Sequence, residues 1–113
     1  MTIRERITSI QNKLAAGDVS PDEASKMMNI IAALYGNIND EIRACDLAYA
    51  KILLNFLDTE TKANRAKIKA ECSKEFENKC VARNIKTLAD EILRSLRYFL
   101  KTKEQEYRAG RYQ

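Results

Sequence analysis

PDEASKMMNIIAALYGNINDEIRACDLAYAKILLNFL, which spans residues 21–57, is the stretch that decides the fold of this 113-residue chain. Apolar side chains recur in it at alternating intervals of four and three residues, the heptad spacing of a helix that packs along one face. The pattern keeps its phase through Gly36, so we expect one continuous helix in which the glycine costs about 1 kcal/mol. The positions that follow the spacing are Ala24, Met28, Ile31, Tyr35, Ile38, Ile42, Cys45, Tyr49, Ile52 and Phe56.

Capping residues mark where the first two helices begin and end. Ser20, followed three residues later by Glu23, forms a capping box at the start of the long heptad stretch. Ahead of it, Thr2 is placed to cap a short helix over about residues 2–16, and Gly17 is placed to stop that helix. The first helix is therefore short and separate from the second.

A reversal is expected at residues 58–61, where Asp, Thr, Glu and Thr offer caps and no apolar side chain. No glycine or proline follows until Gly110, so the pattern predicts a third helix over about residues 60–109. The predicted fold class is all-α: a long antiparallel, coiled-coil-like helical hairpin with a short N-terminal helix. We expect a single helical domain over residues 1–113.

The hairpin leaves part of its apolar surface uncovered. Its reversal sets the alanine-rich, weakly apolar residues 62–77 against residues 44–57, which are apolar on nearly every side. An uncovered patch of this kind is typical of an interface, so we expect a homo-oligomer. An alternative breaks the third helix near Asn84 and folds residues 85–100 back over the patch, which gives a compact four-helix monomer. The residues expected to mediate self-association are Leu47, Leu53, Leu54 and Leu57.

Composition excludes several classes of function. The chain is 45% hydrophobic and 32% charged, as in folded soluble proteins, and it contains no histidine, the commonest general base and metal ligand. Cys45, Cys72 and Cys80 are odd in number and irregularly spaced, which favours free thiols in the cytoplasm over a zinc site. We find no glycine-rich phosphate loop, secretory signal or membrane span. We therefore expect a protein that is not an enzyme, with no cofactor, metal, membrane or small-molecule substrate.

Positive charge gathers in the second half of the chain. Residues 1–61 hold 6 Lys and Arg against 9 Asp and Glu, whereas residues 62–113 hold 14 against 7. Ten charged positions, eight of them basic, are spaced by threes and fours and so share one helix face, with Tyr98 on its flank. These positions are Lys79, Arg83, Lys86, Asp90, Arg94, Arg97, Lys101, Glu104, Arg108 and Arg111.

A second basic cluster follows the reversal and contains no acid: Lys62, Arg65, Lys67 and Lys69. Both sets fit an acidic partner, either nucleic acid or a protein that handles it, because rows of cations contact phosphates and an adjacent aromatic ring stacks on an unpaired base. The same side chains also serve simply to keep a helix in water. An anionic membrane is less favoured, because the basic face borders no large free apolar face.

The segment ADEILRSLRYFL, residues 89–100, followed by EQEYR, residues 104–108, resembles the C-terminal helix of small helical proteins encoded by bacteriophages and prophages. The resemblance covers about a fifth of the chain and transfers no site residue. It implies an accessory gene whose product acts in the host cytoplasm, on nucleic-acid machinery or against host defence. Two hypotheses follow: a self-associating helical protein that binds nucleic acid, or an inhibitor or adaptor that binds one host protein and no free nucleic acid.

Overall fold

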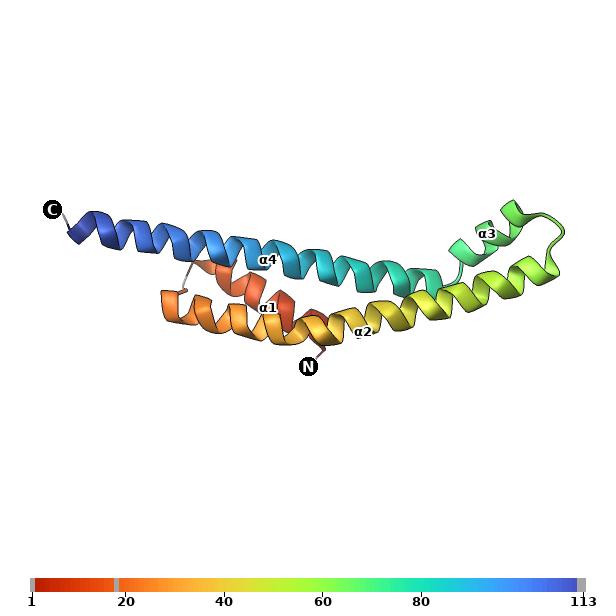
Figure 1. The fold of residues 1–113 in the computed structure, drawn as a ribbon, viewed down its shortest axis with the longest axis horizontal. Coiled ribbons are helices and arrows are strands. Elements are labelled where there is room, and N and C mark those ends of the chain that lie inside the picture. Colours follow the sequence, from red (N-terminus) through yellow and green to blue (C-terminus); the bar gives the residue numbers. More distant parts are fainter. Residues whose placement is uncertain (1, 18, 112–113) are drawn as a thin grey trace. The chain divides into compact units, whose positions relative to one another are not determined.

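The computed structural model describes residues 2–17 and 19–111 and places them in four helices with no strand. Within this described part, none of the helices combines the length and the apolar character that a bilayer crossing requires. The predicted all-α class, a long helix pair with a short N-terminal helix, is confirmed. The helices are α1 (Ile3–Ala16), α2 (Pro21–Thr59), α3 (Ala63–Glu71) and α4 (Lys74–Arg111) (Figure 1).

Local caps fix both ends of α1. The Thr2 hydroxyl oxygen accepts a hydrogen bond from the Glu5 N–H at 3.2 Å. Gly17 adopts a left-handed backbone with φ of 78°, and its N–H donates to the Leu14 carbonyl at 3.1 Å. Only glycine takes this conformation at little cost, so the helix ends there. The helix begins at Ile3, one residue after the predicted start, and ends at Ala16 as predicted.

The capping box at the start of α2 is formed as its sequence indicates. The Ser20 hydroxyl accepts from the Glu23 N–H at 3.2 Å and donates to the Glu23 carboxylate at 3.3 Å. The helix then passes through Gly36 without interruption and ends at Thr59, two residues beyond the predicted end. The heptad pattern therefore predicts this helix well, because its apolar spacing outweighs one weak helix former.

The third predicted helix, over residues 60–109, is corrected by the structure, because α3 and α4 are separate. Ser73 divides them: its hydroxyl donates to the Ala70 carbonyl at 2.5 Å and accepts from the Phe76 N–H at 3.2 Å. A serine side chain that bonds the backbone in this way ends one helix and caps the next. Since α4 runs unbroken through Asn84, the alternative with a break at that residue is also wrong.

The chain divides into two compact units. We call Met1–Gly36 with Thr87–Gln113 the three-helix unit, and Asn37–Lys86 the hairpin unit. The three-helix unit holds α1, the first part of α2 and most of α4. The hairpin unit holds the rest of α2 and α4 together with α3.

Large aliphatic side chains from all three helices fill the three-helix unit. Met27 and Leu34 are buried, whereas Met28 and Tyr35, which the heptad pattern placed inside, are only half-buried. The buried face of α2 is wider than a two-helix seam because α2 contributes to a core shared by three helices. The buried apolar residues of this unit are Ile7, Ile10, Ala24, Met27, Ile31, Leu34, Ala89, Ile92, Leu93 and Leu96.

The hairpin unit has a smaller interior. Its buried apolar residues, among those described, are Ile38, Ala66, Ala70 and Ala82. Tyr49 and Phe76 add a half-buried ring pair with centroids 5.4 Å apart. Because alanine fills little volume, this unit removes less apolar surface from water than the three-helix unit does.

Candidate functional site

The predicted basic face lies entirely on α4 and extends over both units. Lys79, Arg83 and Lys86 belong to the hairpin unit. The side chain of Arg111 lies outside the described residues. The part in the three-helix unit consists of Arg94, Arg97, Lys101 and Arg108, with Tyr98 beside them.

Of the three cations that the predicted basic face has in the hairpin unit, two contact partners within that unit. The Lys79 ammonium lies 4.5 Å from the centroid of the Tyr49 ring. Arg83 Nη2 lies 2.7 Å from Asp46 Oδ2. These contacts join α4 to α2, so both side chains help to hold the unit together. Lys86 is exposed.

In the three-helix unit, Arg94, Arg97 and Lys101 are exposed, and none of them forms an ion pair with a described carboxylate. Arg108, by contrast, pairs with Glu104 at 2.7 Å. Among the described members of the predicted face in this unit, the cations without an ion pair are therefore Arg94, Arg97 and Lys101.

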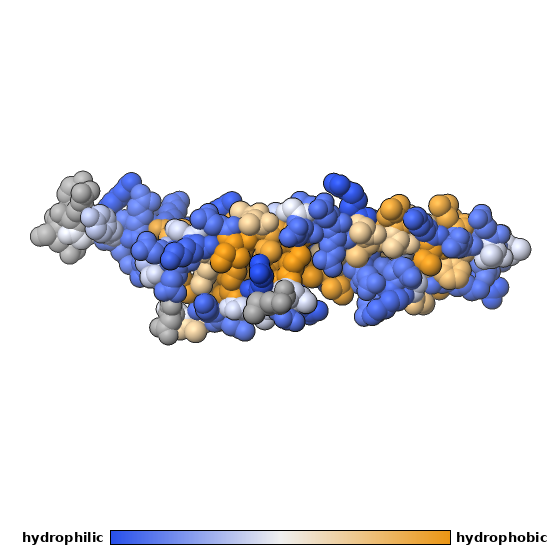
Figure 2. All heavy atoms as spheres, turned by 90° about the horizontal axis from the view of Figure 1, so that it is seen from below, coloured by the Kyte–Doolittle hydropathy of each residue, from blue (hydrophilic) through white to orange (hydrophobic). Residues whose placement is uncertain are grey.

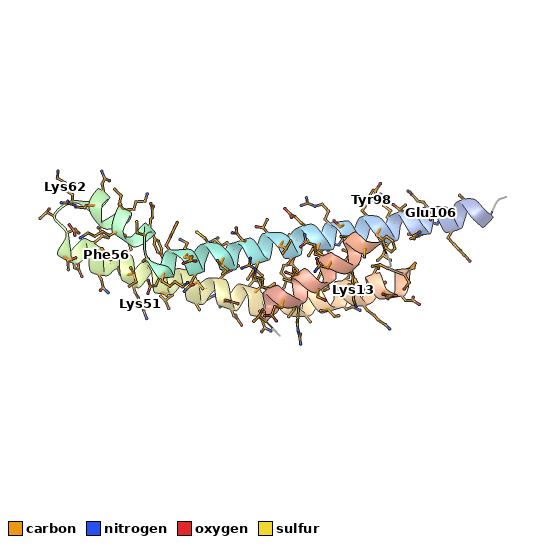
Figure 3. All side chains as sticks on the ribbon, turned by 180° about the vertical axis from the view of Figure 1, so that it is seen from behind. Lys13, Lys51, Phe56, Lys62, Tyr98 and Glu106 are labelled. Carbon is orange, nitrogen blue, oxygen red and sulfur yellow. The ribbon has the colours of Figure 1, made fainter. Side chains whose placement is uncertain are left out.

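Tyr98 lies among these cations and is 74% exposed. Figure 3 shows its side chain pointing away from α1 and α2. Arg94 precedes it by four residues and Lys101 follows it by three, so both are its neighbours on the helix surface. The result is an exposed aromatic ring with a cation about one helical turn away on either side.

The acid inside this face, Asp90, is held by Tyr35 of α2, whose hydroxyl donates a hydrogen bond to its carboxylate. Burial, then this hydrogen bond and the charge of Asp90, raise the pKa of Tyr35 from 10.0 to about 12, while Arg97 opposes the shift. A hollow of about 370 Å³ lies here, lined by Tyr35, Asp90, Leu93, Arg94 and Arg97.

Tyr35 is a residue that the sequence analysis missed as part of the site. Asp90 stands four residues before Arg94, the spacing at which a helical ion pair forms. In the structure the carboxylate of Asp90 bonds Tyr35 instead, and Arg94 forms no ion pair with any carboxylate that the structure describes. The available signal was a tyrosine on the apolar stripe, because a half-buried phenol needs a hydrogen-bond partner.

The second basic cluster, residues 62–69, has an acidic side chain next to it in the structure, although none lies within its sequence. The chain reversal brings Glu60 against Lys69, and the two form an ion pair. The hydrogen bond from Lys69 lowers the pKa of Glu60, although partial burial opposes this. Lys62, Arg65 and Lys67 are exposed on and just before α3.

Of the four leucines predicted to mediate self-association, three are exposed: Leu47 by 57%, Leu54 by 60% and Leu57 by 40%. Leu53 is half-buried, so it belongs partly to the interior of the hairpin unit. With the exposed Ala50, the three leucines follow a 3-4-3 spacing and form one stripe along α2. Figure 2 shows apolar residues at the surface towards the α3 end of the view.

The cysteines show no arrangement for metal binding. Cys72 and Cys80 are exposed and Cys45 is half-buried, all with free thiols. Burial, followed by the charges of Glu41 and Asp46, raises the pKa of the Cys45 thiol and so lowers its reactivity. Among the described residues, no three His, Cys, Asp or Glu side chains gather as metal ligands.

Comparison with protein-family models, with curated proteins and with solved structures gives no match for this chain. Function must therefore be argued from the side chains themselves. The strongest arrangement is the exposed cationic group Arg94, Arg97 and Lys101 with Tyr98, which we call the α4 face.

Proposed function

We propose that this is a non-enzymatic helical binding protein that presents the α4 face to nucleic acid or to a complex that handles nucleic acid. The observation that supports this is the absence of ion pairs at Arg94, Arg97 and Lys101 among the described residues, while the nearby acid Asp90 bonds Tyr35. Unpaired cations are available to phosphates without first breaking an internal contact. The whole chain also lacks histidine, which favours binding over catalysis.

The setting that fits this proposal is a phage or prophage accessory protein in the host cytoplasm. The resemblance of residues 89–100 to phage-encoded helices supports it, as do the free cysteines, which are typical of a reducing compartment. Because the α4 face contributes three cations, phosphate binding should weaken with salt at a slope of roughly −2 to −3 in log K against log salt.

The decisive experiment is titration of labelled single- and double-stranded DNA and RNA at several salt concentrations. We compare the natural chain with the triple variant Arg94→Glu, Arg97→Glu, Lys101→Glu. The expected result is tight, salt-sensitive binding that the triple variant loses. If the folded triple variant binds as tightly as the natural chain, the α4 face is not the site.

A matched control separates local contacts from the effect of net charge. Arg4, Lys13 and Lys26 are exposed on α1 and α2 of the same unit. Their triple replacement by glutamate makes the same change in net charge away from α4. This control should retain most of the binding, and an equal loss in both variants would point to unspecific attraction.

We further propose that the chain self-associates through the leucine stripe of α2, with Leu47, Leu54 and Leu57 at its centre. Exposed apolar side chains at heptad spacing match a second copy of the same surface. The half-buried Leu53 is a lesser contributor.

The same exposed leucines favour a second candidate, an inhibitor or adaptor of one host protein, for example an anti-defence factor. In that case the leucine stripe docks on the target, and the cations match an acidic groove and set the association rate. This candidate requires a stoichiometric complex with one protein and no affinity for free DNA or RNA, so the titration distinguishes the two.

A further inference from the structure

Tyr98 is more exposed than Tyr49 and Phe99, the aromatic side chains that pack in the two units. The ring of Tyr49 is covered by Phe76 and by the Lys79 ammonium, and Phe99 is half-buried with Lys103 near its ring. Tyr98 is 74% exposed and, among the described residues, makes no hydrogen bond or ring contact. The contacts in the described part of the chain therefore give this ring no packing role.

The cations around Tyr98 add a second observation. Arg94 and Lys101 lie seven residues apart on one helix, roughly 10 Å along its axis, with Tyr98 between them. Neither forms an ion pair with a described carboxylate. A flat ring flanked by two free cations offers a stacking surface for one base and a charge for the phosphate on either side.

Resting on the proposed function, we infer that the preferred ligand of the α4 face is a single-stranded nucleic acid, with one base stacked on Tyr98 and the neighbouring phosphates at Arg94 and Lys101. In a duplex both faces of each base are covered by stacking, and exposing one requires local unstacking. In a single strand the base faces are accessible. Since every base has an aromatic face, such binding tolerates different sequences.

Tyr35 of α2 also affects the cations beside Tyr98. Its hydroxyl bonds one oxygen of Asp90 and so competes with Arg94 for this carboxylate. Arg94 also lines the hollow formed with Asp90, Leu93 and Arg97.

The test uses the full chain and four probes: a labelled 12-nucleotide oligodeoxythymidylate, its duplex with oligodeoxyadenylate, an oligouridylate of the same length and the matching RNA duplex. The natural chain should bind both single strands at least tenfold more tightly than the duplexes. Tyr98→Ala should weaken single-strand binding roughly 5- to 100-fold, the loss expected for one base–aromatic stack. Duplex binding should change less than twofold, and Tyr98→Phe should keep the natural affinity.

A spectroscopic arm reports stacking directly. The chain contains no tryptophan, so Tyr98→Trp introduces a single indole at this position. Its fluorescence should be quenched when oligodeoxythymidylate binds, and circular dichroism checks that every variant keeps its helix content.

Equal affinity for single strands and duplexes, or an equal loss in both on Tyr98→Ala, would overturn the single-strand inference and leave the proposed function standing. If none of the probes binds even at low salt, the proposed binding of nucleic acid to the α4 face fails, and the inference fails with it. An unquenched indole in a variant that still binds oligodeoxythymidylate would likewise exclude stacking at this ring.

Discussion

The three-helix unit and the hairpin unit share α2 and α4 but fill their interiors with different side chains. In the first, α1 supplies Ile7 and Ile10 to a core that also encloses Ile31 and Leu96. In the second, the side chains that α3 buries in the interior are Ala66 and Ala70. Where the added helix is rich in large aliphatic residues, the helix pair gains a core, and where it is rich in alanine, leucines stay outside.

Polar contacts take a larger part in the hairpin unit. Arg83 pairs with Asp46, and Lys69 pairs with Glu60, at positions that remain partly exposed. Exposed ion pairs of this kind contribute little to stability. The hairpin unit should therefore be the less stable of the two units. Its exposed apolar side chains are suited to contact with a partner.

The largest expected effect compares the same substitution in both units. Ile31→Ala empties a fully buried site and should lower the free energy of unfolding by about 2–5 kcal/mol. Ile52→Ala, at a half-buried position of the hairpin unit, should cost clearly less, and Leu54→Ala at an exposed position should fall within about 0.5 kcal/mol. Denaturant titration followed by circular dichroism measures all three.

If Ile52→Ala lowers the free energy of unfolding as much as Ile31→Ala does, the interiors of the two units contribute equally to stability. The prediction that the hairpin unit is the less stable one is then wrong. Hydrogen exchange gives an independent check. Amides of α3 should exchange faster than those of α2 around Ile31, because less apolar surface covers them.

Self-association provides the next effect. The double variant Leu47→Glu, Leu54→Glu places charges on the leucine stripe and should convert an oligomer into a 13.0 kDa monomer. Light scattering across a range of concentrations measures the mass. Ser25→Glu with Ala32→Glu makes a similar change at two exposed positions of α2 in the three-helix unit and should leave the mass unchanged.

A natural chain that stays monomeric at every concentration would show that the leucine stripe does not bind a second copy. The stripe would then be assigned to a different protein, as the inhibitor or adaptor candidate requires. A mass that grows steadily beyond a dimer would instead favour a third alternative, in which the helical hairpin is a structural scaffold or spacer in an assembly.

Local signals in the sequence predict much of this fold, and long-range contacts account for what they miss. Thr2, Gly17 and Ser20 bond atoms within three or four residues of themselves, so their caps follow from the sequence. The break at Ser73 was not predicted because its serine lies in a run of helix formers, with no glycine or proline to mark it.

The candidate site shows the same division. Spacing along one helix predicts which cations share a face, but it does not say which of them are free. That depends on partners far away in the chain: Asp46 lies 37 residues from Arg83, and Tyr35 lies 55 residues from Asp90. Sequence spacing therefore predicted a face of eight cations, and among those that the structure describes in the three-helix unit, the cations without an ion pair are Arg94, Arg97 and Lys101.

The smallest expected effect concerns Tyr35, which we treat as a positioning residue for the α4 face. Tyr35→Phe removes the hydrogen bond to Asp90 and leaves that carboxylate to pair with Arg94. Affinity for oligodeoxythymidylate should fall roughly two- to fivefold, since an exposed pair is worth about 0.2–1 kcal/mol. Adding Asp90→Asn should restore the affinity, because the competing carboxylate is gone. A loss that persists in the double variant would mean that Tyr35 acts through packing alone.

The pH dependence of stability tests the same contact without a ligand. Because the pKa of Tyr35 is raised from 10.0 to about 12 in the folded chain, folding favours its neutral form. The stability that this provides is fully present below about pH 10, where the phenol is neutral in both states, and is lost as the pH rises towards 12. Tyr35→Phe should remove this part of the pH dependence and the matching late step in tyrosinate absorbance. If the tyrosinate step that Tyr35→Phe removes lies near pH 10 instead, neither burial nor Asp90 raises the pKa of Tyr35 in solution, and this contact is not formed there.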